Sequence, residues 1–245
     1  MRNPVDDTDP PSARGAGTAM QTWTARQLRR FLDHAASEQP SRIRVDEHGD
    51  PVVLPPDRLH ALYVLLATTG MRRGEACGLR WDDVDVDARR AAIRQTRLVV
   101  DHDVHVDTPK SRRGVRNVAL DAETVTVLRR WRAFQLQERM RWGEAWTDTG
   151  LVFTREDGSP VHPDRVSKRF KARIAETDVP EIRLHDLRHT WASLALAAGV
   201  HPKGGQRAPG PRHGEHDARR LLARDLRLAG RRGGHRRRPH LRRRR

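Results

Sequence analysis

Hydrophobic residues recur every three to four positions in five stretches of this chain, which is the spacing of an amphipathic helix. The stretches cover residues 28–35, 59–66, 125–131, 166–174 and 185–198. Thr24 and Gln27 form a capping box before the first of them. Asp121 offers a second N-cap, and Pro163 suits a first helical turn. Gly70 is placed to end the second helix, because glycine adopts the left-handed conformation without strain.

Alternating apolar positions predict a β region between the second and third helices. It runs from residues 91–93 through residues 104–106 to residues 115–120. Residues 151–153 form a further short strand candidate, and a polar, proline-bounded segment at residues 46–56 separates the first two helices. We therefore expect a mainly α fold of the α+β class, with a small antiparallel β-sheet.

The two ends of the chain lack this periodicity. Residues 1–21 combine proline, glycine and charge with almost no apolar residues, so they cannot offset the entropy of ordering. Residues 204–245 hold 15 arginines and three acidic residues, and therefore carry +12 of the total net charge of +16. We predict a disordered linker remnant at residues 1–21, one domain at residues 22–203, and a disordered Arg/Gly/Pro-rich tail at residues 204–245.

Composition narrows the class of protein. The single cysteine, Cys77, excludes a disulfide framework and a cysteine-based zinc site. No apolar run approaches the length of a membrane helix, and the start lacks the pattern of a signal peptide. We therefore expect a cytoplasmic protein with no membrane partner.

The first candidate motif is Arg72-Arg73-Gly74-Glu75, just after the helix-ending Gly70. An arginine at the mouth of a turn can hold a phosphate with two parallel N–H donors, which lysine cannot imitate. A surface Arg–Glu pair with no ligand is the alternative for this motif taken alone.

The second candidate is Lys110, in a polar run between two predicted strands. Gly114 marks the expected tip of a hairpin there. If Arg112 and Arg113 lower its pKa, the ammonium can donate a proton to a leaving oxygen. A solvated charged turn is the alternative.

The third candidate is the stretch from His185 to His189 at the start of the last helix. Helical spacing places His185, Arg188 and His189 on one face, while Leu187 and Trp191 belong to a core-facing stripe. A zinc helix with two histidines is the alternative, but the charge of Arg188 opposes a dication and no third ligand is evident.

Order and spacing join the three motifs. The segments Thr69–Trp81 and Leu184–Thr190 resemble the two signature boxes of tyrosine recombinases of the phage integrase family. The resemblance implies a catalytic domain of a site-specific recombinase from a mobile element, with double-stranded DNA as partner. It further implies strand cleavage and rejoining through a phosphotyrosine, without metal or other cofactor, in tetramers on DNA.

The resemblance also implies the roles of single residues. Arg72 and Arg188 would bind the non-bridging oxygens of the scissile phosphate and neutralise transition-state charge. His185 would assist by hydrogen bonding or proton transfer, and Lys110 would protonate the leaving 5′ oxygen. The remaining candidates are the supporting residues Glu75 and His189 and the DNA-binding residues Arg73, Arg112 and Arg113.

The nucleophile of the family is missing. The only tyrosine, Tyr63, lies on an apolar helix face and is expected in the core. If residues 204–223 are written as degenerate codons and shifted by one nucleotide, the triplets are compatible with VVSERLGHATVSMTLDAYSH, which contains the expected Leu-Gly-His box and tyrosine. We hypothesise a frameshift near codon 204, and a start that lacks the family's separate N-terminal domain.

Three hypotheses follow from this sequence. The chain is a recombinase catalytic domain by lineage whose copy is cleavage-dead, or a non-catalytic DNA-binding protein that keeps the phosphate clamp, or a decayed product without function.

Overall fold

The computed structural model describes residues 21–37, 39–45, 51–54, 57–108 and 115–199, and for 39–45 and 51–54 it describes the backbone alone. The five helices expected from the hydrophobic spacing are all present, and a short sixth helix follows Arg72. The helices are α1 (Ala25–Ala36), α2 (His60–Thr69), α3 (Arg73–Gly78), α4 (Ala122–Trp142), α5 (Pro163–Ile174) and α6 (Asp186–Ala197), with 3-10 turns at Trp81–Asp83 and Gly143–Ala145.

The predicted helix ends are confirmed. Thr24 and Gln27 form the capping box of α1, with the Gln27 side chain accepting the Thr24 N–H at 2.9 Å. Asp121 caps α4 by accepting the N–H of Thr124 at 2.7 Å. Gly70 ends α2 with φ of +63°, a conformation that favours glycine.

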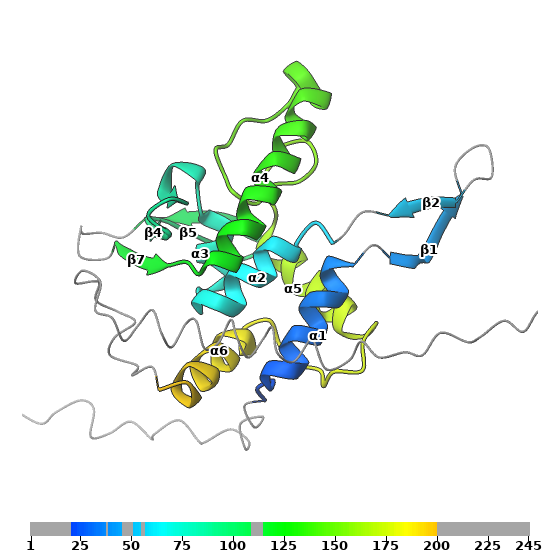
Figure 1. The fold of residues 1–245 in the computed structure, drawn as a ribbon. Coiled ribbons are helices and arrows are strands. Elements are labelled where there is room, and N and C mark those ends of the chain that lie inside the picture. The colour runs from blue at the N-terminus through cyan, green and yellow to red at the C-terminus, as the bar shows by residue number, and fades with distance from the viewer. Residues whose placement is uncertain (1–20, 38, 46–50, 55–56, 109–114, 200–245) are drawn as a thin grey trace, which may run out of the picture.

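The described strands are short and pair only antiparallel. They are β1 (Gln39–Val45), β2 (Pro51–Leu54), β3 (Val84–Asp85), β4 (Arg90–Ile93), β5 (Thr96–Val100), β6 (Asp103–Asp107) and β7 (Arg116–Ala119). They form three separate sheets, of order β1-β2, β3-β4-β7 and β5-β6, where one small sheet was expected. The β1–β2 pair stands away from the helices (Figure 1).

Three expectations about strands were wrong. The strands on either side of Lys110 are not partners, because β6 pairs with β5 and β7 pairs with β4. Residues 151–153 form no strand: Leu151 makes a single isolated bridge with Arg80. The segment between α1 and α2 contains β1 and β2, which its polar, proline-bounded sequence did not suggest. Alternation predicts that a segment is extended but not which strand it pairs with, and β7 pairs with β4 across the intervening β5 and β6.

The core forms around α2, which is buried on nearly every face and contacts α1, α4 and α6. Trp23, Phe31, Tyr63 and Phe170 pack there with ring centroids 5.0 to 5.8 Å apart. Tyr63 is fully buried, as expected from the sequence. In the described ranges, no helix combines the length and apolar composition needed to cross a bilayer.

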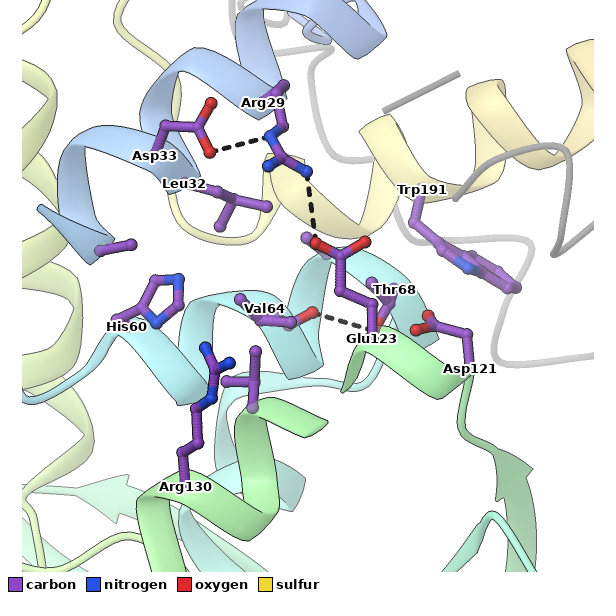
Figure 2. A pocket seen from close by; sticks show the side chains of 13 residues that line it. Arg29, Leu32, Asp33, His60, Val64, Thr68, Asp121, Glu123, Arg130 and Trp191 are labelled. Atoms are coloured by element: carbon purple, nitrogen blue, oxygen red, sulfur yellow. Dashed lines mark hydrogen bonds and ion pairs between the residues drawn. The ribbon is translucent and has the colours of Figure 1, made fainter. Parts of the chain in front are cut away.

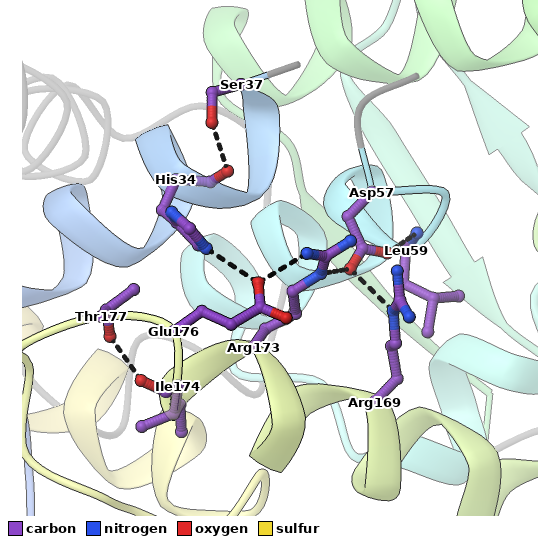
Figure 3. Close-up of polar contacts among 9 residues, drawn as sticks. All are labelled: His34, Ser37, Asp57, Leu59, Arg169, Arg173, Ile174, Glu176 and Thr177. Carbon is purple, nitrogen blue, oxygen red and sulfur yellow. Dashed lines mark hydrogen bonds and ion pairs between the residues drawn. The ribbon is translucent and has the colours of Figure 1, made fainter. Parts of the chain in front are cut away.

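Buried ion pairs fix α5 against the rest of the core. The Asp57 carboxylate, before α2, accepts hydrogen bonds from Arg169 and Arg173 of α5 (Figure 3). Glu176 bonds both Arg173, at 2.7 Å, and His34 of α1, at 3.1 Å. Buried charges are costly without such partners, so this network favours one placement of α5.

A cavity of about 220 Å³ lies where α1, α2 and α4 meet, close to Trp191 of α6 (Figure 2). Arg29 is one of its lining residues and bonds Asp33 at 2.8 Å and Glu123 at 3.2 Å. Arg29 thus ties the first helix to the start of α4.

Candidate active site

The turn between α2 and α3 presents Arg72. Its backbone is extended, and its N–H donates to Glu75 Oε2 at 2.7 Å, so that Glu75 closes the first turn of α3. The Arg72 guanidinium makes one 3.1 Å bond to Glu75 Oε1. The Arg72 side chain is 60% exposed whereas that of Glu75 is 7% exposed, so the arginine keeps donors for a ligand.

Arg116 on β7 is a member of this cluster that the sequence did not indicate. Its Nη1 and Nη2 donate to the two oxygens of Glu75, both at 2.7 Å. Burial alone would raise the pKa of Glu75, but hydrogen bonds from Arg116 and Arg72 hold that pKa below its usual range. The period-2 pattern of β7, which puts Arg116 on the same face as buried Val118, was the available signal.

Arg188 reaches the same place from α6. Its Nη1 donates to the carbonyl oxygen of Gly70, the residue that ends α2. Burial, together with the positive charges of Arg72 and Arg116, lowers the pKa of Arg188. Three guanidiniums therefore converge around one carboxylate, and the cluster carries an excess of positive charge.

Gly70 also determines how closely α6 approaches. A Cβ added at Gly70 would lie 2.5 Å from Cε3 of Trp191, so only glycine leaves room for the indole. The same residue thus permits the left-handed turn, seats Trp191 and accepts the Arg188 bond. Gly70 sets the position of Arg188 relative to Arg72.

His185 and His189 lie on the first turn of α6, with ring centroids 5.2 Å apart in an edge-on arrangement. His185 is exposed. The pKa of its imidazole is lowered by burial of part of the ring and by the nearby His189 and Arg188. Asp186 is buried and bonds Arg183 at 2.9 Å. Within the residues that the structure describes, no group of three His, Cys, Asp or Glu is arranged to hold a metal ion.

The other face of α6 differs in part from the expectation. Leu187 is buried as expected, whereas Trp191, expected on the same core-facing stripe, is half-buried. Asp186 and Thr190 take buried positions instead. Thr190 can be buried at this position because its hydroxyl accepts the N–H of Trp23 at 3.1 Å.

The expected DNA-binding residues are placed unequally. Arg73 points to α5, where it bonds Asp164 at 2.8 Å and Ser167 at 2.9 Å. Lys110, Arg112 and Arg113 lie outside the described residues.

A family model described as the phage integrase family matches residues 52–226, more than half of the chain. The chain belongs to the phage integrase family. The match continues past residue 203, into the segment that the frameshift hypothesis assigns to another reading frame. The domain boundaries proposed from the sequence remain a prediction.

Relatives of this family member are recombinases and integrases by name. A tyrosine recombinase XerC-like protein of Caldanaerobacter subterraneus is 28% identical over 155 residues, covering 58% of this chain and 40% of the relative. The ICEBs1 integrase of Bacillus subtilis is 28% identical over 149 residues, covering 60% and 40%. The chain thus spans about two fifths of the length of these relatives.

Solved structures of low identity share the fold of this family member. The integrase of the transposon Tn1549, in complex with transposon right end DNA, matches with a TM-score of 0.58 at 19% identity, covering 89% of this chain and 67% of that one. The XerA recombinase matches with a TM-score of 0.56 at 19% identity, covering 88% and 66%. The fold is therefore that of tyrosine recombinase catalytic domains.

Proposed function

We propose that this chain is the catalytic domain of a site-specific recombinase by descent, and that it binds duplex DNA by gripping one phosphodiester between Arg72 and Arg188. The observation that carries the proposal is the convergence of these two arginines at Gly70, from segments more than 100 positions apart. The integrase of Tn1549, which shares the fold, is itself described in complex with DNA.

The geometry suits a dispersed negative charge. Arg72 has an exposed guanidinium with one long bond, and Arg188 is bound to a carbonyl oxygen, so both can turn to an anion without leaving a buried carboxylate unpaired. A phosphate would relieve the mutual repulsion that lowers the pKa of Arg188. During strand cleavage the same donors would stabilise the charge that gathers on the non-bridging oxygens.

We assign proton handling to two further residues. His185 lies beside Arg188, and burial, His189 and Arg188 lower its pKa, which favours the neutral imidazole that can accept a hydrogen bond or proton from a reacting hydroxyl. Lys110 is proposed as the general acid on the leaving 5′ oxygen. Glu75 and His189 are proposed to orient these groups, and Arg73, Arg112 and Arg113 to contact the DNA backbone.

We propose that this chain binds DNA without cleaving it. The only tyrosine of the chain is Tyr63, which is fully buried among aromatic rings. Burial raises its pKa, so a phenolate nucleophile is disfavoured at that position. The proposal includes cytoplasmic location and, as in the family, assembly on DNA.

A nicked duplex that traps covalent intermediates tests cleavage, and fluorescence anisotropy with intact duplex tests binding. We expect no covalent adduct, and a loss of affinity of at least about tenfold for Arg72→Ala and for Arg188→Ala, because a hydrogen bond to a charged group contributes about 1.5–3 kcal/mol. Arg129→Ala is the matched control, since Arg129 is an exposed arginine of α4 that pairs with Asp87 in the turn between β3 and β4. Equal affinity of all three variants would refute phosphate binding by Arg72 and Arg188. A covalent adduct would refute the proposed loss of DNA cleavage.

A further inference from the structure

The Glu75 carboxylate is shared unequally between two arginines. Arg116 approaches it with two 2.7 Å bonds, one to each oxygen, while the Arg72 guanidinium makes a single bond of 3.1 Å. The Arg116 side chain is 28% exposed and that of Arg72 is 60% exposed. Arg116 is therefore the stronger partner of Glu75, and Arg72 is the more available cation.

We infer that Arg116 is a positioning residue that keeps Arg72 free to bind phosphate by occupying Glu75. This inference rests on the proposed DNA-binding function. Arg116 neither replaces Arg72 nor needs to touch DNA in this role: it acts through the carboxylate that the two arginines share.

The physical reason is the cost of an unpaired buried carboxylate. Glu75 is 7% exposed on its side chain, so its two oxygens must be satisfied by donors within the protein. Without Arg116, the nearest guanidinium is that of Arg72, three positions away on the same turn. Arg72 would then bind Glu75 with both nitrogens and withdraw from the exposed side of the cluster.

The placement of Arg116 on a strand supports this role. β7 pairs with β4, and Arg116 itself is opposite Ile93, a buried residue of that strand. The backbone of Arg116 is thus held by a different element from the one that carries Arg72 and Glu75. A guanidinium fixed in this way holds the carboxylate in place while Arg72 remains free to change partners.

Anisotropy measurements of duplex DNA binding by full-length variants, at one fixed salt concentration, test the inference. We expect Arg116→Ala to weaken binding about tenfold, as Arg72→Ala does, because both remove the same phosphate contact. Adding Glu75→Gln to Arg116→Ala should restore affinity to within about threefold of the unmodified chain, since a neutral amide does not hold Arg72. Adding Arg116→Ala to Arg72→Ala should cost nothing further.

Three results would overturn the inference. If Glu75→Gln fails to restore binding to the Arg116→Ala variant, Arg116 acts on DNA directly or through the fold. If Arg72→Ala weakens binding and Arg116→Ala does not, Arg116 has no such role although the proposed function stands. If Arg72→Ala has no effect, the proposed function itself fails, and the inference fails with it.

A second variant guards against a folding defect. Arg116→Lys keeps the positive charge and one of the two bonds to Glu75, so it should lower the thermal unfolding midpoint less than Arg116→Ala does. We expect it to bind DNA with an affinity between those of the unmodified chain and Arg116→Ala. Affinity as low as that of Arg116→Ala despite the higher midpoint, and without recovery by Glu75→Gln, would contradict the shared-carboxylate role.

Discussion

The surroundings of His185 determine the pKa of its imidazole. Partial burial, His189 and Arg188 all favour the neutral imidazole and place its pKa below the ordinary value of 6.5. A bound phosphate would add a negative charge beside the ring and raise this pKa. Binding of DNA should therefore be coupled to uptake of a proton at His185.

We predict that affinity for DNA rises as the pH falls from 7 toward the pKa range below 6.5, and that His185→Gln removes part of this rise. Uptake of one proton changes an equilibrium constant by at most about tenfold per pH unit. Binding titrations across this pH range measure the slope. His102→Gln, on the exposed β5–β6 turn, is the control that should leave the slope unchanged.

The lowered pKa of His185 affects folding stability in the opposite direction from DNA binding. A histidine whose pKa is lower in the folded chain binds fewer protons there than in the unfolded chain, so acid removes stability.

An identical pH slope of DNA binding in His185→Gln and in the unmodified chain would mean that the imidazole takes no part in the site.

At the scale of elements, the contact between α2 and α6 depends on one glycine. Gly70 has a positive φ, and a Cβ there would meet three atoms of the Trp191 ring between 2.5 and 3.1 Å. Arg188 lies on the same helix as Trp191 and bonds the carbonyl of Gly70. A displacement of the indole would therefore also displace a candidate catalytic residue.

We predict that Gly70→Ala lowers the free energy of unfolding by about 2–4 kcal/mol, the sum of about 1–2 kcal/mol for the left-handed conformation and a similar cost for overpacking. Urea unfolding measures the change. Gly199→Ala is the matched control, because Gly199 also has a positive φ but no atom of the described residues lies within 4 Å of its Cβ position.

The control should show the conformational cost alone. Equal losses in Gly70→Ala and Gly199→Ala would mean that Trp191 does not pack on Gly70 in solution.

Elements were predictable from sequence where the determining contacts are local. Caps and helical spacing act within one or two turns, so α1, α2 and α4 were located with their ends. The β1–β2 pair was missed because its polar, proline-bounded sequence does not alternate, and the division into separate sheets depends on which strands pair, including the distant pair β4–β7, which alternation cannot reveal.

The candidate site divides in the same way. Arg72, His185 and Arg188 were proposed because motif spacing singles them out, and the structure places Arg188 close to Arg72 and to His185, while their roles stay a prediction. Arg116 was missed because its meaning comes from Glu75, 41 positions earlier in the chain. Lys110 stays a prediction, since its segment lies outside the described residues.

At the scale of the whole molecule, the rate at which Cys77 reacts with thiol reagents shows whether the domain has a stable core. This residue of α3 is 1% exposed, and burial raises the pKa of its thiol to about 12. Because the thiolate is the reactive form, the native chain should react slowly with thiol reagents. Reaction then requires that the domain opens.

We predict that Cys77 is labelled at least about a hundredfold more slowly in buffer than in concentrated urea, because opening of a marginally stable domain costs several kcal/mol. Labelling kinetics with a maleimide measure the ratio. The control is the double variant Cys77→Ser, Ser193→Cys, whose thiol sits at an exposed position of α6 and should react quickly in both conditions. Equal rates in buffer for the two thiols would support a decayed chain without a stable fold.

Trp23 links the beginning of the described chain to its last helix. Its backbone N–H donates to Thr190 across 167 positions, and its indole N–H donates to the Pro180 carbonyl at 2.8 Å. During translation α1 leaves the ribosome long before these acceptors have been made, so the part of its apolar surface around Trp23 stays uncovered until then. The nascent chain therefore needs protection from aggregation until the codons around Thr190 have been read, and completes its core only then.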